Sequence, residues 1–390
     1  MERFRGKIWN EEVFQQYLKT VPSTHENSLI KNGLFSEINK YKSLMTSQTG
    51  GNAVVEPIKG RIGGNPVNYD GNTDIPDGAE RGTFYQRKVC YGRAQSWGEY
   101  DFSTEITGEN FMAEAQEIKD YWDEERQKTV LAILKGIFGM SGGVNGQFVT
   151  KHTYEITADA TNPDAHLTAD GANRALQKAL GDRKKQFEVA FMHSVTSTNL
   201  EGINQITFLK YNDANGIQRD LTLGTWNGKL VVVDDDMPVL EGYDEATSAT
   251  AGALHVVASS PSDGEIKLSD VKASDFYPAD VANGDYVVAG TKYVTYVFKK
   301  QFFEHENIGV ERPAELDRKP KEKGGKTDII SRIREMIVPM YISYIGTEMS
   351  PTNANFANGA KWEIVNNGDS DSKVYVDPKL IPVAQIISRG

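Results

Sequence analysis

The chain has 390 residues, more than the roughly 250–300 at which one hydrophobic core stops growing, so the sequence predicts two or more domains or one domain with long appendages. A single cysteine, Cys90, excludes an intramolecular disulfide, and the lack of an apolar run of about 18 residues argues against membrane insertion and secretion. The formal net charge of −11 disfavours a protein that reads nucleic-acid sequence, because such proteins carry a concentrated basic surface.

Residues 1–50 carry two short helical patterns separated by helix breakers. Asn10 is placed to cap the first pattern and Pro22 to end it. The second, "NSLIKNGLFSEINKYKSLM", is interrupted by Gly33. Isolated helices shorter than about 12–15 residues are marginal in water. We therefore expect this segment to lie on another surface as an arm.

Residues 51–101 are rich in glycine and contain two strand-like runs, around 53–62 and 83–91. They predict a long hairpin. In the second run apolar and polar residues occur on both faces, so neither face is suited to a core of its own. An isolated hairpin is at best marginally stable in water, so this one is expected to dock on another body.

The clearest element is the helix of residues 109–138. Apolar side chains recur at helical spacing, and only Arg126 interrupts the stripe. The first half is acidic and the last turns are basic, which suits the helix dipole. At 1.5 Å per residue the helix is about 45 Å long, which is more than a compact domain of ordinary size needs.

From residue 168 helices and strands alternate, which predicts a mixed α/β body. "TADGANRALQKALGDRKKQ" and "SVTSTNLEGINQ" read as helices, and "FEVAFMHS" and "WNGKLVVVDD" read as strands. Residues 241–285 are rich in Ala, Ser, Asp and Gly and weakly periodic, which indicates an insertion. The rest of the chain is rich in β-strand patterns, interrupted by a charged stretch at 314–326.

Three stretches imitate functional motifs and depart from them. Residues 320–327, "PKEKGGKT", resemble a phosphate-binding loop, but lack its first glycine, the preceding buried strand and the following helix. Asp70, Asn72 and Asp74 match three positions of a calcium loop that lacks its turn glycine and its glutamate. The six histidines show no helical pair of the zinc-hydrolase kind, and Cys90 is expected to be a packed thiol.

The run Asp234-Asp235-Asp236 follows the strand "KLVVV". If the strand continued, Asp234 and Asp236 would converge on one face, as the ligands of a metal-dependent enzyme do. Because no further His or carboxylate ligands stand at motif-like spacing, we expect these aspartates to face water or a neighbour's lysines. No catalytic residue, metal or cofactor is predicted.

The order of these parts resembles the major capsid protein of tailed bacteriophages, which has the Hong Kong 97-like fold, an α+β capsid fold. The resemblance rests on the arm, the glycine-rich hairpin, the spine helix, "FEVAFMHS", "TWNGKLVVVDDDMPV" and "YVTYVFKKQFF". It implies the following parts: an N-terminal arm at 1–50, an extended E-loop at 51–101, a peripheral domain at 102–150 and 290–340 with its spine helix at 109–138, and an axial domain at 155–290 and 345–390.

The resemblance implies a structural protein, not an enzyme, that self-assembles into the hexamers and pentamers of an icosahedral shell around double-stranded DNA. Expected partners are a separate scaffolding protein, a portal and a decoration protein, with no membrane partner, no N-terminal cleavage and no covalent lysine–asparagine link. The expected location is the virion, after assembly in the cytoplasm of the host bacterium. From charge, we expect contacts between subunits to pair basic hairpin residues with acidic spine-helix residues, namely Arg61, Arg81, Arg87 and Lys88 with Glu114, Glu117 and Asp120.

Three alternatives remain open from the sequence. An encapsulin, a nanocompartment shell protein of the same fold, would hold enzymes instead of a genome. A metal-dependent enzyme would use Asp234 and Asp236. A tail or baseplate protein is disfavoured by the long spine helix, since such proteins are mostly built from β-structure.

Overall fold

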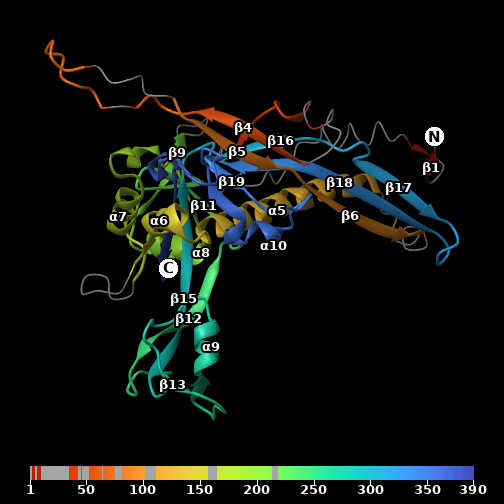
Figure 1. Cartoon of the computed structure of the whole chain (residues 1–390). Coiled ribbons are helices and arrows are strands. Elements are labelled where there is room, and N and C mark those ends of the chain that lie inside the picture. Colours follow the sequence, from red (N-terminus) through yellow and green to blue (C-terminus); the bar gives the residue numbers. More distant parts are fainter. Residues whose placement is uncertain are drawn as a thin grey trace. The chain divides into compact units, whose positions relative to one another are not determined.

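The computed structural model describes residues 2–4, 7–9, 35–42, 45, 52–63, 65–74, 81–101, 111–156, 165–212 and 218–390 (Figure 1). The chain divides into two compact units. The first comprises Met1–Val149 and Lys300–Ile381, and the second comprises Thr150–Lys299 and Pro382–Gly390. The two units are described separately below.

A five-stranded sheet forms the body of the first unit. Its longest strand, β18, pairs antiparallel with β6 along ten residues and with β17 and β16 over its two halves, and β3 pairs in parallel with β16. The strands are β3 (Phe35–Glu37), β6 (Tyr91–Tyr100), β16 (Phe303–Asn307), β17 (Ala314–Lys319) and β18 (Lys326–Pro339).

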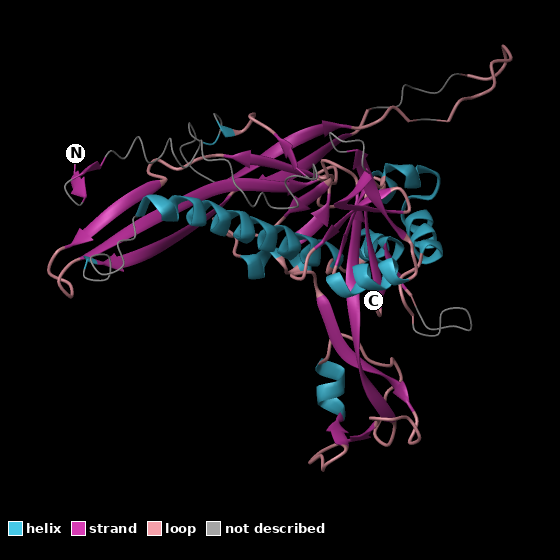
Figure 2. Ribbon diagram, turned by 180° about the vertical axis from the view of Figure 1, so that it is seen from behind, coloured by secondary structure: helices cyan, strands magenta, loops and turns pink. Residues whose placement is uncertain are grey.

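The spine helix α5 (Phe111–Phe138) lies along this sheet, as Figure 2 shows, and confirms the helix predicted from the apolar stripe. Ile118 and Trp122 of α5 pack against Ala314 and Ile329 of the sheet. The indole N–H of Trp122 donates to Ser331 Oγ at 2.9 Å. With 28 residues the helix is about 42 Å long.

The C-terminal end of α5 is covered by a small cluster. It holds β19 (Ile342–Tyr344), α10 (Asn353–Phe356), the 3-10 turn η2 (Gly359–Lys361) and β20 (Trp362–Ile364), with β19 and β20 paired. Gly136 of α5 allows the closest approach, because a Cβ at that position would lie 1.9 Å from the Phe356 carbonyl oxygen. The 3-10 turn η3 (Pro378–Leu380) follows near the end of the unit.

The predicted hairpin is present as β4 (Ala53–Lys59) and β5 (Thr83–Val89), which pair antiparallel over seven residues. We call these strands and the connection between them the hairpin. It is joined to the unit by a backbone hydrogen bond from Tyr85 N–H to the Asn366 carbonyl. Residues 91–100, expected to be part of the hairpin, instead form β6 of the sheet, because β6 finds its hydrogen-bond partner in β18.

The N-terminal region differs from the expected pair of short helices where it is described. Residues Glu2–Phe4 (β1) and Lys7–Trp9 (β2) pair antiparallel, and Phe35–Glu37, within the second predicted helical pattern, are strand β3. The helical expectation is wrong at 35–37 because these residues extend the sheet beside β16. The turn expected between Asn10 and Pro22 lies outside the described residues.

A ten-stranded mixed sheet is the framework of the second unit. Its central strands β8 (Val189–Met192) and β11 (Lys229–Val233) are parallel, and both match the strands predicted from "FEVAFMHS" and "KLVVV". The path through the sheet is β14-β13-β15-β8-β11-β10-β9, with β12 and β21 also on β15 and β7 on β21. The flanking strands are β7 (Thr153–Glu155), β9 (Ile206–Asn212), β10 (Gln218–Trp226), β15 (Tyr286–Phe298) and β21 (Val383–Ser388).

Two helices follow the predicted pattern in this unit. Helix α7 (Ala169–Leu180) begins at Thr168, whose hydroxyl accepts from the Gly171 N–H, and buries its apolar side chains in the core with residues of β21. The 3-10 turn η1 (Gly181–Gln186) continues it, and α8 (Ser194–Gly202) follows β8. Helix α6 (Gly143–His152) spans the point at which the two units are divided.

The stretch predicted to be an insertion folds around an apolar cluster of its own, Val256, Val271, Val281 and Val287. Strand β12 (Val239–Ala246) pairs with β15 over eight residues, and beyond this ribbon lie β13 (Leu254–Val257), β14 (Glu265–Lys267) and α9 (Leu268–Ala273). Within the second unit, Figure 1 shows the ribbon carrying these elements away from α7 and α8.

The expected domain boundaries differ from this division in two places. Residues 290–299, expected with 102–150, belong to the second unit. Residues 345–381, expected with 155–290, belong to the first unit. The reason is local: β20 pairs with β19, and Trp362 packs in a T-shaped contact on Tyr344. The naming of the two units as peripheral and axial domains stays a prediction.

Candidate functional site

The hairpin turns polar and apolar side chains alike toward the body of the first unit. Glu56, Gln86 and Lys88 point inward, and Gln86 and Lys88 are 5% and 1% exposed. Val54, on the same face, packs against an apolar cluster of the unit. On the other face Val55 is 56% exposed and Tyr85 is 44% exposed. The outward face therefore leaves two large apolar side chains uncovered, where an ordinary half-buried strand pair turns polar groups to water.

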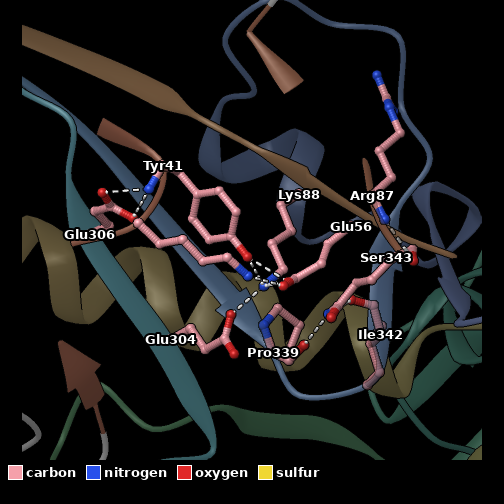
Figure 3. Close-up of polar contacts among 11 residues, drawn as sticks. Tyr41, Glu56, Arg87, Lys88, Glu304, Glu306, Pro339, Ile342 and Ser343 are labelled. Carbon is pink, nitrogen blue, oxygen red and sulfur yellow. Dashed lines mark hydrogen bonds and ion pairs between the residues drawn. The ribbon is translucent and has the colours of Figure 1, made fainter. Parts of the chain in front are cut away.

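Lys88 is the centre of the inward face. Its ammonium group lies 2.7 Å from Glu56 of β4, pairs also with Glu304 of β16, and donates to the Tyr41 hydroxyl at 3.1 Å. Figure 3 shows these four side chains converging from the hairpin, the sheet and the segment around Tyr41. An unpaired buried charge is strongly unfavourable, so this set of partners is what allows a lysine in the interior.

The electrostatics of the cluster keep its lysine and its Glu56 carboxylate charged. Burial lowers the pKa of Lys88, but the hydrogen bonds from Lys88 to Glu304, Glu56 and Tyr41 outweigh it, and the pKa is raised. Burial raises the pKa of Glu56, but its bonds to Lys40, Lys88 and Tyr41 outweigh this effect and lower the pKa to about 2. The cluster is therefore an ion-pair anchor at neutral pH, with no group poised to give or take a proton.

The neighbouring hairpin residues are held by backbone carbonyls. The Gln86 amide donates to the carbonyl oxygens of Pro339 and Ile342, at 2.9 and 3.0 Å. The Arg87 guanidinium donates to the Tyr344 carbonyl at 3.0 Å, and the Arg87 N–H donates to Ser343 Oγ. Each residue from Gln86 to Lys88 therefore has a specific partner in its own chain, and these partners fix the register of the hairpin base.

The segment around Tyr41 is attached to the same place. We call residues 35–45 the arm segment, of which 35–42 and 45 are described. The Glu306 carboxylate accepts from the backbone N–H groups of Tyr41 and Lys42, at 2.9 and 2.6 Å. Tyr41 and Met45 also pack with Cys90 in a shared apolar cluster.

A second buried network joins the sheet to the spine helix. Arg126 of α5 donates two hydrogen bonds to Glu335 of β18, at 2.6 and 3.0 Å, in the bidentate geometry that makes such pairs strong. His305 of β16 lies 3.4 Å from Glu335 and 2.7 Å from Glu37 of the arm segment. Burial lowers the pKa of His305, but these two carboxylates raise it to about 9.

The connection between the hairpin strands exposes large apolar side chains. Tyr69 is 92% exposed and Ile62 is 77% exposed. Asp70 fixes the turn beside Tyr69, because its carboxylate accepts from the backbone N–H groups of Asn72 and Thr73. The stretch that resembles a calcium loop is thus an Asx turn. Arg81 Nε donates to the Gly60 carbonyl at 2.7 Å and joins the two strands.

The residues expected to contact a neighbouring subunit have different positions. Arg61 and Arg81 are exposed on the hairpin, as expected. Lys88 is buried among partners of its own chain, and Arg87 binds carbonyls of its own chain. The contact of these two residues with a neighbouring subunit stays a prediction. Asp120 is half-buried on α5. The side chains of Glu114 and Glu117, on the same helix, lie outside the described residues.

The three aspartates after β11 have structural contacts. The strand ends at Val233, and the Asp234 carboxylate accepts from the Asp236 N–H at 2.9 Å, so it closes a turn. Hydrogen bonds from Ser194 lower the pKa of Asp235, which lies 3.9 Å from His193. Because the strand does not continue, Asp234 and Asp236 do not form the facing pair that the metal-enzyme alternative required.

The other residues that resemble functional motifs lie in a loop between two strands or in the packed interior. Residues 320–325 connect β17 to β18 in an antiparallel hairpin, so no helix follows the lysine-rich loop. Cys90 is fully buried, and burial raises the pKa of its thiol to about 11. In the part of the chain that the structure describes, no three His, Cys, Asp or Glu side chains gather as a metal site would require. None of the described helices is long and apolar enough to cross a membrane.

The partners of Lys88 and Arg126 were not predicted from the sequence. Arg126 interrupts the apolar stripe of the spine helix, and a buried arginine requires an acidic partner, here Glu335. The run "FFEHEN" places three ionisable residues directly after two buried phenylalanines, at 304–306. Charged residues beside buried apolar ones are rarely buried unless they are paired, so this run could have predicted buried ion pairs.

No family model matches the sequence, and no curated protein matches it. Among solved structures, the capsid of Ralstonia phage GP4 matches with a TM-score of 0.51 at 10% sequence identity, over 98% of this chain and 95% of that chain. The chain has a phage capsid fold. The cyanophage Pam1 capsid asymmetric unit covers 100% of this chain and 97% of its own at a TM-score of 0.48 and 11% identity. The head structure of Helicobacter pylori bacteriophage KHP40 covers 95% and 93%, with a TM-score of 0.46 and 12% identity. The expected α+β capsid fold is confirmed.

Proposed function

We propose that this protein is a major capsid protein that self-assembles into the hexamers and pentamers of an icosahedral shell enclosing double-stranded DNA. It acts as a structural protein of the virion and not as an enzyme. Its net charge of −11 suits a shell that does not hold packaged DNA tightly. A scaffolding protein, a portal and a decoration protein are its proposed partners, and the cytoplasm of the host bacterium is the proposed place of assembly.

One observation carries the proposal: the hairpin leaves large apolar side chains uncovered on its outward face and on the connection between its strands. Val55 and Tyr85 are exposed on the strands, and Ile62 and Tyr69 on the connection. Burying apolar surface is worth roughly 25 cal/mol per Å², so covering this face favours association. Closed symmetry lets each copy cover the hairpin of the next, and several modest contacts per copy add up to a stable shell.

Charge pairs between copies are a second part of the proposal. Of the four basic hairpin residues expected to make contacts between subunits, Arg61 and Arg81 are exposed. Glu114, Glu117 and Asp120 of a neighbouring copy's spine helix are their proposed partners. Arg61→Glu should reduce the yield of particles, and Glu117→Arg in the same chain should restore part of it. The pairing would be contradicted if Arg61→Glu reduced the yield of particles and neither Glu117→Arg nor Glu114→Arg restored it.

Negative-stain electron microscopy of the purified chain tests the assembly. We expect closed shells or capsomers, from the chain alone or together with the products of the genes that flank its own. A species that stays monomeric at every concentration, with and without those products, would contradict the proposal. Nucleic acid inside particles from infected cells supports a phage shell, whereas particles that hold only enzymes would identify an encapsulin.

A further inference from the structure

Strand β16 carries three consecutive ionisable residues that reach three different elements. Glu304 pairs with Lys88 of the hairpin, His305 with Glu37 of the arm segment and Glu335 of β18, and Glu306 with the backbone of the arm segment. Successive side chains of a strand point to opposite faces, so Glu304 and Glu306 share one face and His305 points to the other. The strand therefore has charged contacts on both faces of its sheet.

The face of Glu304 and Glu306 joins the hairpin to the arm segment. Glu56 of β4 accepts from Lys40 and Tyr41 of the arm segment and pairs with Lys88 of β5. Glu306 holds the backbone N–H groups of Tyr41 and Lys42. A displacement of the arm segment thus removes hydrogen bonds from Glu56, Lys88 and Glu306 together.

The face of His305 joins the arm segment to the spine helix. His305 bridges Glu37 and Glu335, and Glu335 in turn receives both hydrogen bonds from Arg126. The side chain of Glu335 is 1% exposed and that of Arg126 13% exposed, so neither charge has water to replace a lost partner. The Tyr91 hydroxyl of β6 also donates to Glu335, at 3.3 Å.

From these contacts we infer that β16 is a coupling strand, through which the hairpin, the arm segment and the spine helix α5 respond to a disturbance as one body. The arm segment connects the two networks, because it takes part in one through Tyr41 and in the other through Glu37. Removing one partner of a buried ion pair leaves the other uncompensated, which makes neighbouring contacts in the same network weaker. The inference concerns the single chain and does not depend on its assembly.

Hydrogen exchange of the full-length chain tests the inference with Glu304→Gln, which removes one charge and keeps the side-chain shape. We expect exchange to rise about fivefold or more, the equivalent of about 1 kcal/mol of lost protection, in the hairpin strands, in the arm segment and in α5. Glu304 contacts the hairpin through Lys88, so a merely local role would leave α5 unchanged. Strands β8 and β21 of the second unit report global unfolding and should not change.

The reciprocal variant is Arg126→Gln, which acts on α5 and should raise exchange in the hairpin, because coupling between two sites has the same magnitude in both directions. Glu125→Gln is the matched control, since Glu125 lies on the same helix and forms an exposed pair with Lys128. If Glu304→Gln does not fold, Tyr41→Phe removes only a hydroxyl from the same network. Changes confined to the element that carries the substitution, in Glu304→Gln or in Tyr41→Phe, would overturn the inference.

Discussion

The ammonium group of Lys88 lies 2.7 Å from a carboxylate oxygen of Glu56, at a place where only 1% of the lysine side chain is exposed. The two residues stand on the paired strands β4 and β5, and their inward direction sets which face of the hairpin is buried. Because Lys88 and Glu56 face inward, Val55 and Tyr85 face outward. The outward face, which we propose is covered by another copy of the chain, is thus oriented by an ion pair within the chain.

Replacing Lys88 by methionine should lower the free energy of unfolding by about 3 kcal/mol, at the low end of the range for removing one partner of a buried pair. The low end applies because the side chains of Glu56 and Glu304 keep 24% and 35% exposure to water. Denaturant unfolding measures the change. Lys59→Met is the control, because Lys59 is exposed on the partner strand of the same hairpin and should change the free energy by less than about 0.5 kcal/mol. Equal effects of the two substitutions would contradict the anchoring role of Lys88.

The stability contributed by His305 should depend on pH. Its pKa is about 9 in the folded chain, against an ordinary value of 6.5, because Glu335 and Glu37 outweigh the opposing effects of burial and Arg126. Because folding raises the pKa, the protonated His305 stabilises the fold fully below about pH 6.5. This stability is lost as the pH rises through about 9, by up to about 1.4 kcal/mol per pH unit. Denaturant unfolding of the wild type and His305→Gln between pH 6 and 10 should show the difference shrinking. A constant difference would mean that His305 is neutral in the folded chain.

Gly136→Ala should destabilise the first unit, although alanine is the better helix former by about 1 kcal/mol. The added Cβ would lie 1.9 Å from the Phe356 carbonyl oxygen and 2.4 Å from Trp362 Nε1, so α10 and β20 must move away from α5. We expect a net loss of about 1–3 kcal/mol. The same change at Gly146, in helix α6, meets no atom closer than 3.6 Å and should stabilise the chain. Thermal unfolding of the two variants should therefore shift in opposite directions, and a shift in the same direction would be inconsistent with the close approach.

The aspartates after β11 should show no specific affinity for a divalent cation. Calorimetric titration of magnesium or manganese should give the same weak, unsaturable heat for the wild type and for Asp234→Asn/Asp236→Asn. Asp234→Ala should cost about 1 kcal/mol of stability, because the turn loses its hydrogen bond to the Asp236 N–H, whereas Asp234→Asn keeps an acceptor there. A saturable binding heat that disappears in the double variant would revive the metal-enzyme alternative.

The sequence predicted the elements whose signal is local. The stripe from Ile118 to Ile137 predicted the spine helix, and "FEVAFMHS" predicted β8, because burial on one face or on both leaves a regular pattern in the chain. Strand β3 was missed because three residues carry no period, and their partner β16 lies about 270 positions away. The end of β11 at Val233 was predicted, because its apolar run stops there, but the hydrogen bond by which Asp234 closes the turn was not.

The candidate site was predicted in outline and missed in its chemistry. The alternation of polar and apolar residues on both faces of 84–91 predicted a hairpin that docks on another body, and docking on a neighbouring copy stays a prediction. The direction of Lys88 was not predictable from this alternation, since both faces of β5 carry polar residues. It depends on Glu304, 216 positions away, and no local pattern records a contact of that range.

The most direct test of the account is photo-cross-linking from the outward face of the hairpin. A photoreactive phenylalanine in place of Tyr85, which is 44% exposed, samples whatever covers that face in assembled particles. We expect a covalent dimer of the chain in particles and no dimer from the dissociated subunit. Particles that assemble normally but yield no cross-link to a second copy, at Tyr85 or at Val55, would contradict the claim that a neighbouring copy covers the hairpin.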